Sequence, residues 1–139
     1  MTGATLPGAG AAHANFVETC LVGVDLSDAG LDGANLSGAN LTRARLPRAD
    51  LTGAQLRGAD LTHADLSGAR LPRATLSAAR LCGARLEGVA ADGATLDGAD
   101  LGGACLRGAG LRGARLTGAK LAGADCAGAV FSDAVRSRR

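Results

Sequence analysis

The residues of this chain that could support catalysis are few and scattered. His13 and His63 are its two histidines, and the four cysteines are Cys20, Cys82, Cys105 and Cys126. A histidine activates a neighbouring serine or cysteine as a nucleophile, but neither histidine has such a partner at a recognisable spacing. The cysteines show no CxxC spacing of the kind that holds zinc. We therefore expect no catalytic, cofactor-binding or metal-binding residues, and we expect that the protein is not an enzyme.

The stretch GAGAAH at residues 8–13 is the one segment with the glycine content of a phosphate-binding loop. A phosphate loop of that kind needs a GKS or GKT sequence and a strand before a helix, and the chain contains neither tripeptide. We interpret its glycines as turn residues, so no small-molecule substrate is expected.

A period of five residues organises the rest of the chain. From Leu21 to Leu121 every fifth residue is leucine, and only Ala91 interrupts the series. Alanine stands two residues before each of these positions from Ala29 to Ala134, with Val89 as the one exception. A helix repeats every 3.6 residues and a strand every 2, so neither would place these side chains on one buried surface. The period predicts a coil of five-residue segments whose leucines and alanines point into a shared axis.

The corners between segments read Leu-x-Gly-Ala in most repeats, which suits a β-turn with a positive φ at its third residue. Pro47 and Pro72 occupy the second turn position, where the φ that the proline ring fixes is favourable. Arg48 and Arg73 follow them in place of glycine. We therefore predict a different turn type at these two corners.

The repeats ANLSG (34–38), ANLTR (39–43), ADLTG (49–53) and ADLSG (64–68) resemble the pentapeptide-repeat family, and the resemblance extends over residues 14–134. It implies an all-β fold, a right-handed quadrilateral parallel β-helix with four repeats per coil and about six coils. Residues 1–13 would be degenerate N-terminal repeats or a cap, either ordered or loose, and residues 135–139 a basic C-terminal tail.

This arrangement predicts which side chains fill the axis. We expect the two phenylalanines to close the ends of the core, because the terminal repeats of a solenoid need caps. Val89 partly replaces the volume missing at Ala91, and Cys126 should point inward. The candidate core residues are Phe16, Leu36, Leu56, Leu76, Leu96, Leu116 and Phe131.

On the outside, side chains at the same position of every fourth repeat become neighbours in adjacent coils. One such column contains Asp25, Arg45, Asp65 and Arg85, so acids alternate with bases along it. Opposite charges on adjacent strands stabilise a sheet by roughly 0.2–1 kcal/mol per pair. We interpret these charges as structural contacts between coils.

The remaining charges are uneven along the chain, with an acidic beginning and an arginine-rich end. We take these as candidate interaction residues: Glu18, Asp25, Asp28, Asp32, Arg136, Arg138 and Arg139. They favour a non-catalytic module that binds another protein, as a monomer or as a homodimer through one end of the β-helix.

The resemblance also implies an alternative function. Family members that confer resistance to fluoroquinolone-type drugs have strongly acidic faces, mimic DNA and bind DNA gyrase or another type II topoisomerase. Here no face carries a continuous acidic stripe, although a DNA mimic needs dense negative charge along its length. Nucleic acid is not expected as a partner, because there is no basic stripe and no aromatic stacking platform.

The chain has no run of about 18 apolar residues, so no membrane-spanning segment is expected. Its first residues, MTGATLPGAG, lack the basic and apolar regions of a secretion signal. We therefore expect a cytoplasmic protein.

Overall fold

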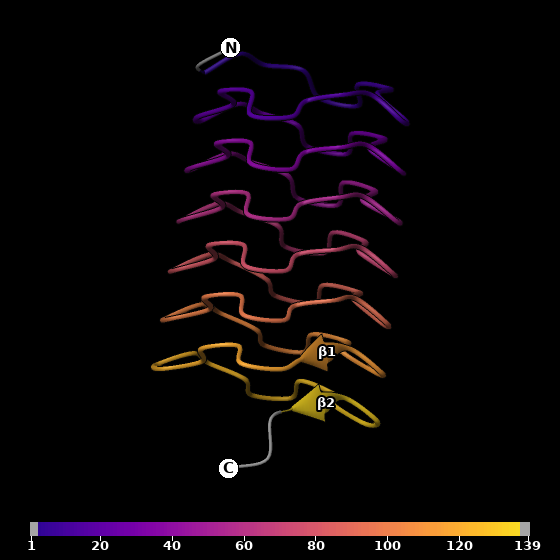
Figure 1. Ribbon diagram of the computed structural model, residues 1–139. Coiled ribbons are helices and arrows are strands. Elements are labelled where there is room, and N and C mark those ends of the chain that lie inside the picture. The colour runs from indigo at the N-terminus through magenta and orange to yellow at the C-terminus, as the bar shows by residue number, and fades with distance from the viewer. Residues whose placement is uncertain (1–2, 137–139) are drawn as a thin grey trace.

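The computed structural model describes residues 3–136, which wind into stacked coils of similar outline (Figure 1). Parallel bridges join each repeat to the fourth repeat after it, from Thr5↔Asp25 to Gly110↔Val130. Two short strands continue this pairing: β1 (Arg115–Leu116) and β2 (Val135–Arg136) are parallel, with Arg115 opposite Val135. The chain therefore completes one coil of the parallel β-helix between bridged residues, and the columns expected from the sequence are true neighbours.

In repeats that lie between two other coils, four of the five main-chain N–H groups are used by the backbone itself. The N–H of Leu36 donates to the carbonyl of Gln55 at 2.7 Å, and that of Gly38 donates to Arg57 at 2.9 Å. The N–H of Asn35 donates at 2.9 Å to Ala14 of the preceding coil, and that of Ala39 closes the turn to Leu36 at 3.0 Å. Because three of these bonds join one coil to another, the ladder between coils holds the fold together.

The fifth N–H belongs to the residue after each central leucine, and a side chain often accepts from it. Asp50 Oδ1 accepts from the N–H of Thr52 at 3.0 Å, and Asp60 Oδ1 accepts from Thr62 in the same way. In two of the five repeats where an arginine stands before the central leucine, at positions 45 and 70, the residue after leucine is Pro47 or Pro72. Proline has no N–H, so these repeats avoid the donor that aspartate would otherwise satisfy.

The third residue of every corner from Gly3 to Asp133 has a positive φ of 54–70°. This includes Arg48 (57°) and Arg73 (58°), so the different turn type that we predicted at the two proline corners is wrong. The ladder decides the conformation: the N–H of Arg48 must reach the carbonyl of Ser67, at 2.9 Å, as glycine does elsewhere. A non-glycine residue in this region is strained by about 1–2 kcal/mol, and the neighbouring coils outweigh that strain.

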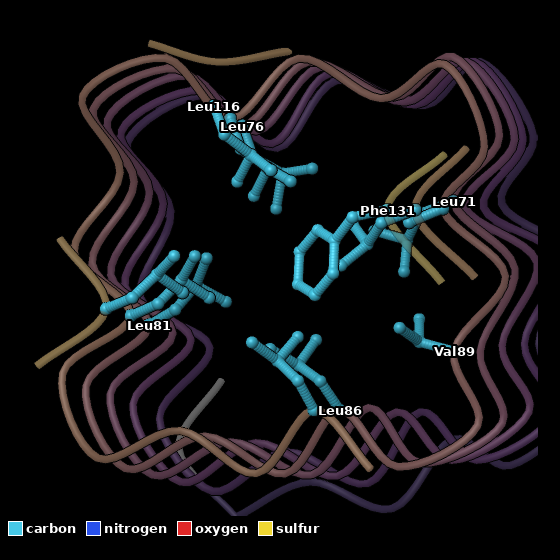
Figure 2. Close-up of a pocket in the computed structure, with 13 residues that line it drawn as sticks. Leu71, Leu76, Leu81, Leu86, Val89, Leu116 and Phe131 are labelled. Carbon is cyan, nitrogen blue, oxygen red and sulfur yellow. The ribbon is translucent and has the colours of Figure 1, made fainter. Parts of the chain in front are cut away.

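The core is a single column of leucine and alanine, and no polar side chain among residues 3–136 is buried. Figure 2 shows leucines from the four sides of the coil meeting near the axis. Five of the candidate core residues are at most 5% exposed: Leu36, Leu56, Leu76, Leu96 and Leu116. Phe16 and Phe131 are half-buried and pack against this core in the first and last described coils.

The missing leucine at Ala91 coincides with an apolar axial cavity of about 20 Å³ (Figure 2). Val89 lines this cavity together with leucines from neighbouring coils. A void of this size can hold at most one water molecule, and an apolar lining gives that water no partner. Val89 therefore compensates for Ala91 only in part, and the cavity offers no room for a metabolite.

The pairing extends on both sides of residues 14–134. Gly10 bridges Gly30, and the N–H of His13 donates to the carbonyl of Asp32 at 2.9 Å, so residues 3–13 follow the same coil. Val135 and Arg136 form β2, whereas Arg138 and Arg139 lie outside the described residues. No helix within residues 3–136 is long and apolar enough to cross a membrane.

Truncation of a mid-rod leucine tests the core. Leu56→Ala should lower the free energy of unfolding by about 2–5 kcal/mol, because the leucine is fully buried and adjacent coils cannot close the cavity. Leu121→Ala, at a half-buried position near the C-terminal end, should cost clearly less. Urea unfolding followed by circular dichroism measures both, and equal losses would contradict this account.

Adjacent alanines test the corner strain. Ala78 has a φ of 56°, so Ala78→Gly should leave stability unchanged or raise it by up to about 1 kcal/mol. Ala79 is fully buried, so Ala79→Gly should destabilise by about 1–2 kcal/mol through lost burial and added chain entropy. Thermal unfolding of both variants should therefore give shifts in Tm of different sign or clearly different size.

Candidate interaction surface

Ion pairs between adjacent coils occur on all four sides of the rod, although the fourth column, which begins at Asn15, has only the pair of Arg115 with Asp97 at 2.7 Å among the described residues. Arginine or lysine of one coil reaches the aspartate one coil earlier in each of the other three columns, which confirms the pairing expected from the sequence. The N···O distances are 3.4 Å for Asp25–Arg45, 3.8 Å for Asp50–Arg70, 3.0 Å for Asp60–Arg80, 3.5 Å for Asp65–Arg85 and 3.8 Å for Asp100–Lys120. The bases are more than half exposed, so each pair contributes little alone, and the columns act mainly by neutralising charge.

The aspartates are held in place by the residue two positions later. A hydrogen bond from the Ser27 hydroxyl is the main cause that lowers the pKa of Asp25, and Thr52 acts in the same way on Asp50. At Asp60, burial alone would raise the pKa, but hydrogen bonds from Thr62 and the charge of Arg80 outweigh it and the pKa is lowered. These carboxylates are therefore ionised at neutral pH and already occupied.

The acidic candidates do not form one open patch. Asp28 makes a bidentate ion pair with Arg48, with both N···O distances at 2.7 Å, and this bond is the main cause that lowers its pKa. Asp32 lies 4.0 Å from Nε2 of His13. Glu18 occupies a corner with a φ of 54°, on a different side of the coil from Asp25 and Asp28. They share the N-terminal end of the rod rather than a single face.

Of the basic candidates, Arg136 is the one that the structure describes. Its guanidinium carbon lies 5.9 Å from the centre of the Phe131 ring, a distance at which a cation is attracted to the ring face. Arg136 therefore lies beside the aromatic side chain at the C-terminal end of the core.

The two histidines lie at corners of the coil. A Cβ placed on Gly33 or Gly83 would lie 2.4 or 2.5 Å from Nδ1 of His13 or His63, so each ring covers the glycine one coil later. No group of three potential metal ligands exists among residues 3–136. The arrangement supports packing rather than acid–base chemistry.

Cys82 and Cys126 are poor nucleophiles. Burial raises the pKa of Cys126, which packs against the core as expected, and burial is also the main cause that raises the pKa of Cys82. Both thiols are therefore protonated at neutral pH, and a thiol attacks as its thiolate. Cys105 donates to a carboxylate oxygen of Glu87, with Sγ 3.2 Å from Oε1.

Comparison with known protein families shows a match for this chain. The family model described as pentapeptide repeats matches eight copies, which cover residues 34–73, 49–88, 74–113 and 109–137. The chain is a pentapeptide-repeat protein. This confirms the resemblance seen in the sequence, and the solved members of this family form right-handed β-helices. No curated protein sequence matched the chain.

Several solved structures of pentapeptide-repeat proteins resemble this one. HetL, a protein involved in heterocyst differentiation regulation in the cyanobacterium Nostoc sp. strain PCC 7120, is 32% identical, with 97% of this chain and 84% of HetL covered and a TM-score of 0.49. A protein of the Arabidopsis thaliana thylakoid lumen is 31% identical over 72% of this chain and 66% of its own, with a TM-score of 0.58. A trypsin-treated form of QnrB1, a plasmid-mediated fluoroquinolone resistance protein, is 18% identical over 98% and 81%, with a TM-score of 0.53, and this likeness shows the fold alone.

The lowered pKa values predict an acid-sensitive rod. A carboxyl whose pKa is lower in the folded state stabilises the fold above its unfolded pKa, near 4, and this stabilisation disappears as the pH falls through the folded pKa. The free energy of unfolding should therefore be nearly flat from pH 8 to 5 and should fall below about pH 4. Asp60→Asn keeps an acceptor for Thr62 but cannot ionise. The free energy of unfolding of this variant should therefore decrease less steeply below about pH 4 than that of the unmodified protein. Identical acid limbs would contradict this role of Asp60.

Proposed function

We propose that this pentapeptide-repeat protein is a non-catalytic interaction module that binds another protein through the sides of its β-helix. The observation that carries the proposal is that the groups capable of chemistry are already used by the fold. The ordered aspartates bind hydroxyls, main-chain N–H groups and bases of the next coil, while the histidines cover glycines. What the sides offer a partner is a rigid array of side chains repeating about every 4.8 Å.

The sides differ in what they would recognise. One column carries Asn15, Asn35, Gln55, Thr75 and Thr95, which are amides and hydroxyls, and ends in Arg115. The column that begins at Thr5 carries the paired Asp25, Arg45, Asp65 and Arg85 instead. A partner that docks over the amides and hydroxyls of the first column would exchange mostly neutral hydrogen bonds there, and its binding would depend less on salt than binding to the charged column.

Binding to DNA gyrase or another type II topoisomerase as a DNA mimic, with resistance to fluoroquinolone-type drugs, is the second candidate. DNA carries one negative charge for each ~1.7 Å of its axis, whereas along these columns a base in the next coil neutralises each paired acid. The feature that favours this candidate is the excess of acid at the N-terminal end, where no lysine or arginine precedes Arg43.

A gyrase supercoiling assay, with and without a fluoroquinolone, distinguishes the two candidates. We expect micromolar protein neither to inhibit supercoiling nor to relieve the drug, because the sides are neutralised. The variant R45E/R85E, which makes one column acidic, is the matched test of whether charge alone limits binding. Inhibition or drug relief by the unmodified protein would overturn our order of preference and direct attention to Glu18, Asp25, Asp28 and Asp32.

The interaction role is tested by affinity capture with variants of each side. A specific partner should be lost on substitution of one side, for example T75K/T95K, and retained when the opposite side carries R85E. Circular dichroism must show unchanged folding for both variants. If both variants lost the partner, or if both still captured it, side-specific recognition would be contradicted.

A further inference from the structure

Several main-chain N–H groups of the last described coil lack the carbonyl acceptors that a following coil supplies elsewhere in the rod. In every earlier coil the N–H of the central residue donates to a carbonyl of the following coil, as Leu106 does to Asp125 at 2.7 Å. In residues 117–136 the corresponding N–H groups of Cys126 and Phe131 donate to no described residue, and neither do those of Gly128 and Asp133. This edge of the β-helix is a row of aligned donors.

The first coil presents the matching row of acceptors. Among residues 3–136, the carbonyls of Thr5, Pro7, Gly10 and Ala12 accept no main-chain hydrogen bond. Their N-terminal edge is the one that a preceding coil would contact. An unpaired strand edge is a template for another chain.

The repeat itself sets the register in which the two edges would meet. If a second copy continues the coil, the N–H groups of Cys126 and Phe131 face the carbonyls of its Thr5 and Gly10. The N–H groups of Thr5 and Gly10 then face the carbonyls of Ala124 and Ala129, as the N–H of Asp25 faces Ala4 within the chain. The parallel ladder of the rod would therefore continue across the junction without a change of pattern.

The apolar surface supports the same contact. All four exposed large apolar side chains lie in the first and last described coils: Leu6, Val17, Val130 and Val135. An open cavity of about 590 Å³, lined by Leu116, Leu121 and Arg136 among others, marks the C-terminal end of the core. In the continued register the large Phe131 lies over the small Ala11, and Cys126 lies over Leu6.

Charge favours head-to-tail contact over contact between like ends. Residues 1–42 contain four acids and no lysine or arginine, whereas residues 112–139 contain six lysines and arginines and two acids. Asp25 and Asp28 pair with arginines of the next coil, and Arg115 and Lys120 pair with aspartates of the preceding coil. The excess that remains is acidic at the first coil and basic at the last. Opposite ends therefore attract, and identical ends repel. Asp133 at the last described corner would also face His13 of the next copy, which is 80% exposed.

We propose that the two ends of the rod form a heterologous interface, through which a second copy of this chain stacks head to tail and extends the β-helix. Such an interface does not close on itself, so it produces short filaments as the concentration rises. The proposal is independent of the binding role proposed for the sides.

Cysteine cross-linking tests the register. Gly10 has open space where a Cβ would lie, and Val130 is exposed in the same column. In a Cys20→Ser background, a mixture of G10C and V130C proteins carrying different tags should form a mixed disulfide dimer on oxidation. Parallel neighbours across adjacent strands lie within the usual disulfide range of about 4.4–6.8 Å between Cα atoms. A90C, in the middle of the same column, is the control and should not cross-link to G10C.

The outcomes separate the alternatives. A mixed G10C–V130C product that exceeds either homodimer at least about tenfold supports the proposal, as does association that weakens when salt is raised from about 50 to 500 mM. Exclusive V130C homodimers would mean a symmetric C-terminal contact and would overturn it. Sedimentation that shows only monomer up to about 0.5 mM, well above the concentration of weak specific complexes, would overturn it as well.

Discussion

The hydrogen-bond ladder between main-chain groups of adjacent coils is the constraint on which the rest of the structure depends. It assigns a partner to four of the five N–H groups in each repeat between the terminal coils, and it requires a positive φ at every corner from Gly3 to Asp133. The ladder consists of main-chain hydrogen bonds, which do not depend on the type of side chain. Residues as different as Ala78 and Arg48 therefore have the same positive φ at their corners. What the side chains add is choice among registers, because a shift by one residue would expose the leucines and break the ion-pair columns.

The same constraint explains why so little chemistry is left over. An aspartate before the central leucine accepts the fifth N–H and pairs with a base in the next coil, so both of its oxygens are occupied, as at Asp60 with Thr62 and Arg80. The apolar residues fill the core, and the axial cavity beside Ala91 holds about 20 Å³. Recognition is then left to the sides and the two ends of the rod. The charges of the sides are largely paired, whereas the two ends keep unpaired main-chain donors and acceptors.

Much of this could be predicted from the sequence because the period is strict. The central leucines and the columns of stacked side chains follow from the period, and the family follows from the resemblance of repeats such as ADLTG (49–53) to known pentapeptide repeats. The corners at Arg48 and Arg73 could not be predicted from local preference, because the coils on either side impose the turn. The role of Pro47 and Pro72 in removing a donor that no aspartate accepts was also missed, because Arg80, Arg85 and Arg115 stand in the same place without a proline after the leucine. The reach of the coil to Thr5 and Arg136 was obscured because small residues such as Gly10 and Ala11 stand where the pattern expects larger ones, although the ladder does not need their side chains.

Residue-resolved amide hydrogen exchange tests the ladder most directly. At low protein concentration, the N–H groups of Leu36, Leu56 and Leu76 should exchange as slowly as global unfolding allows, and those of Cys126 and Phe131 should exchange fast although their side chains are half-buried. Protection should extend to Leu6, whose N–H donates to Asp25 at 2.8 Å. Fast exchange at the mid-rod leucines, or protection confined to a few repeats, would contradict the account.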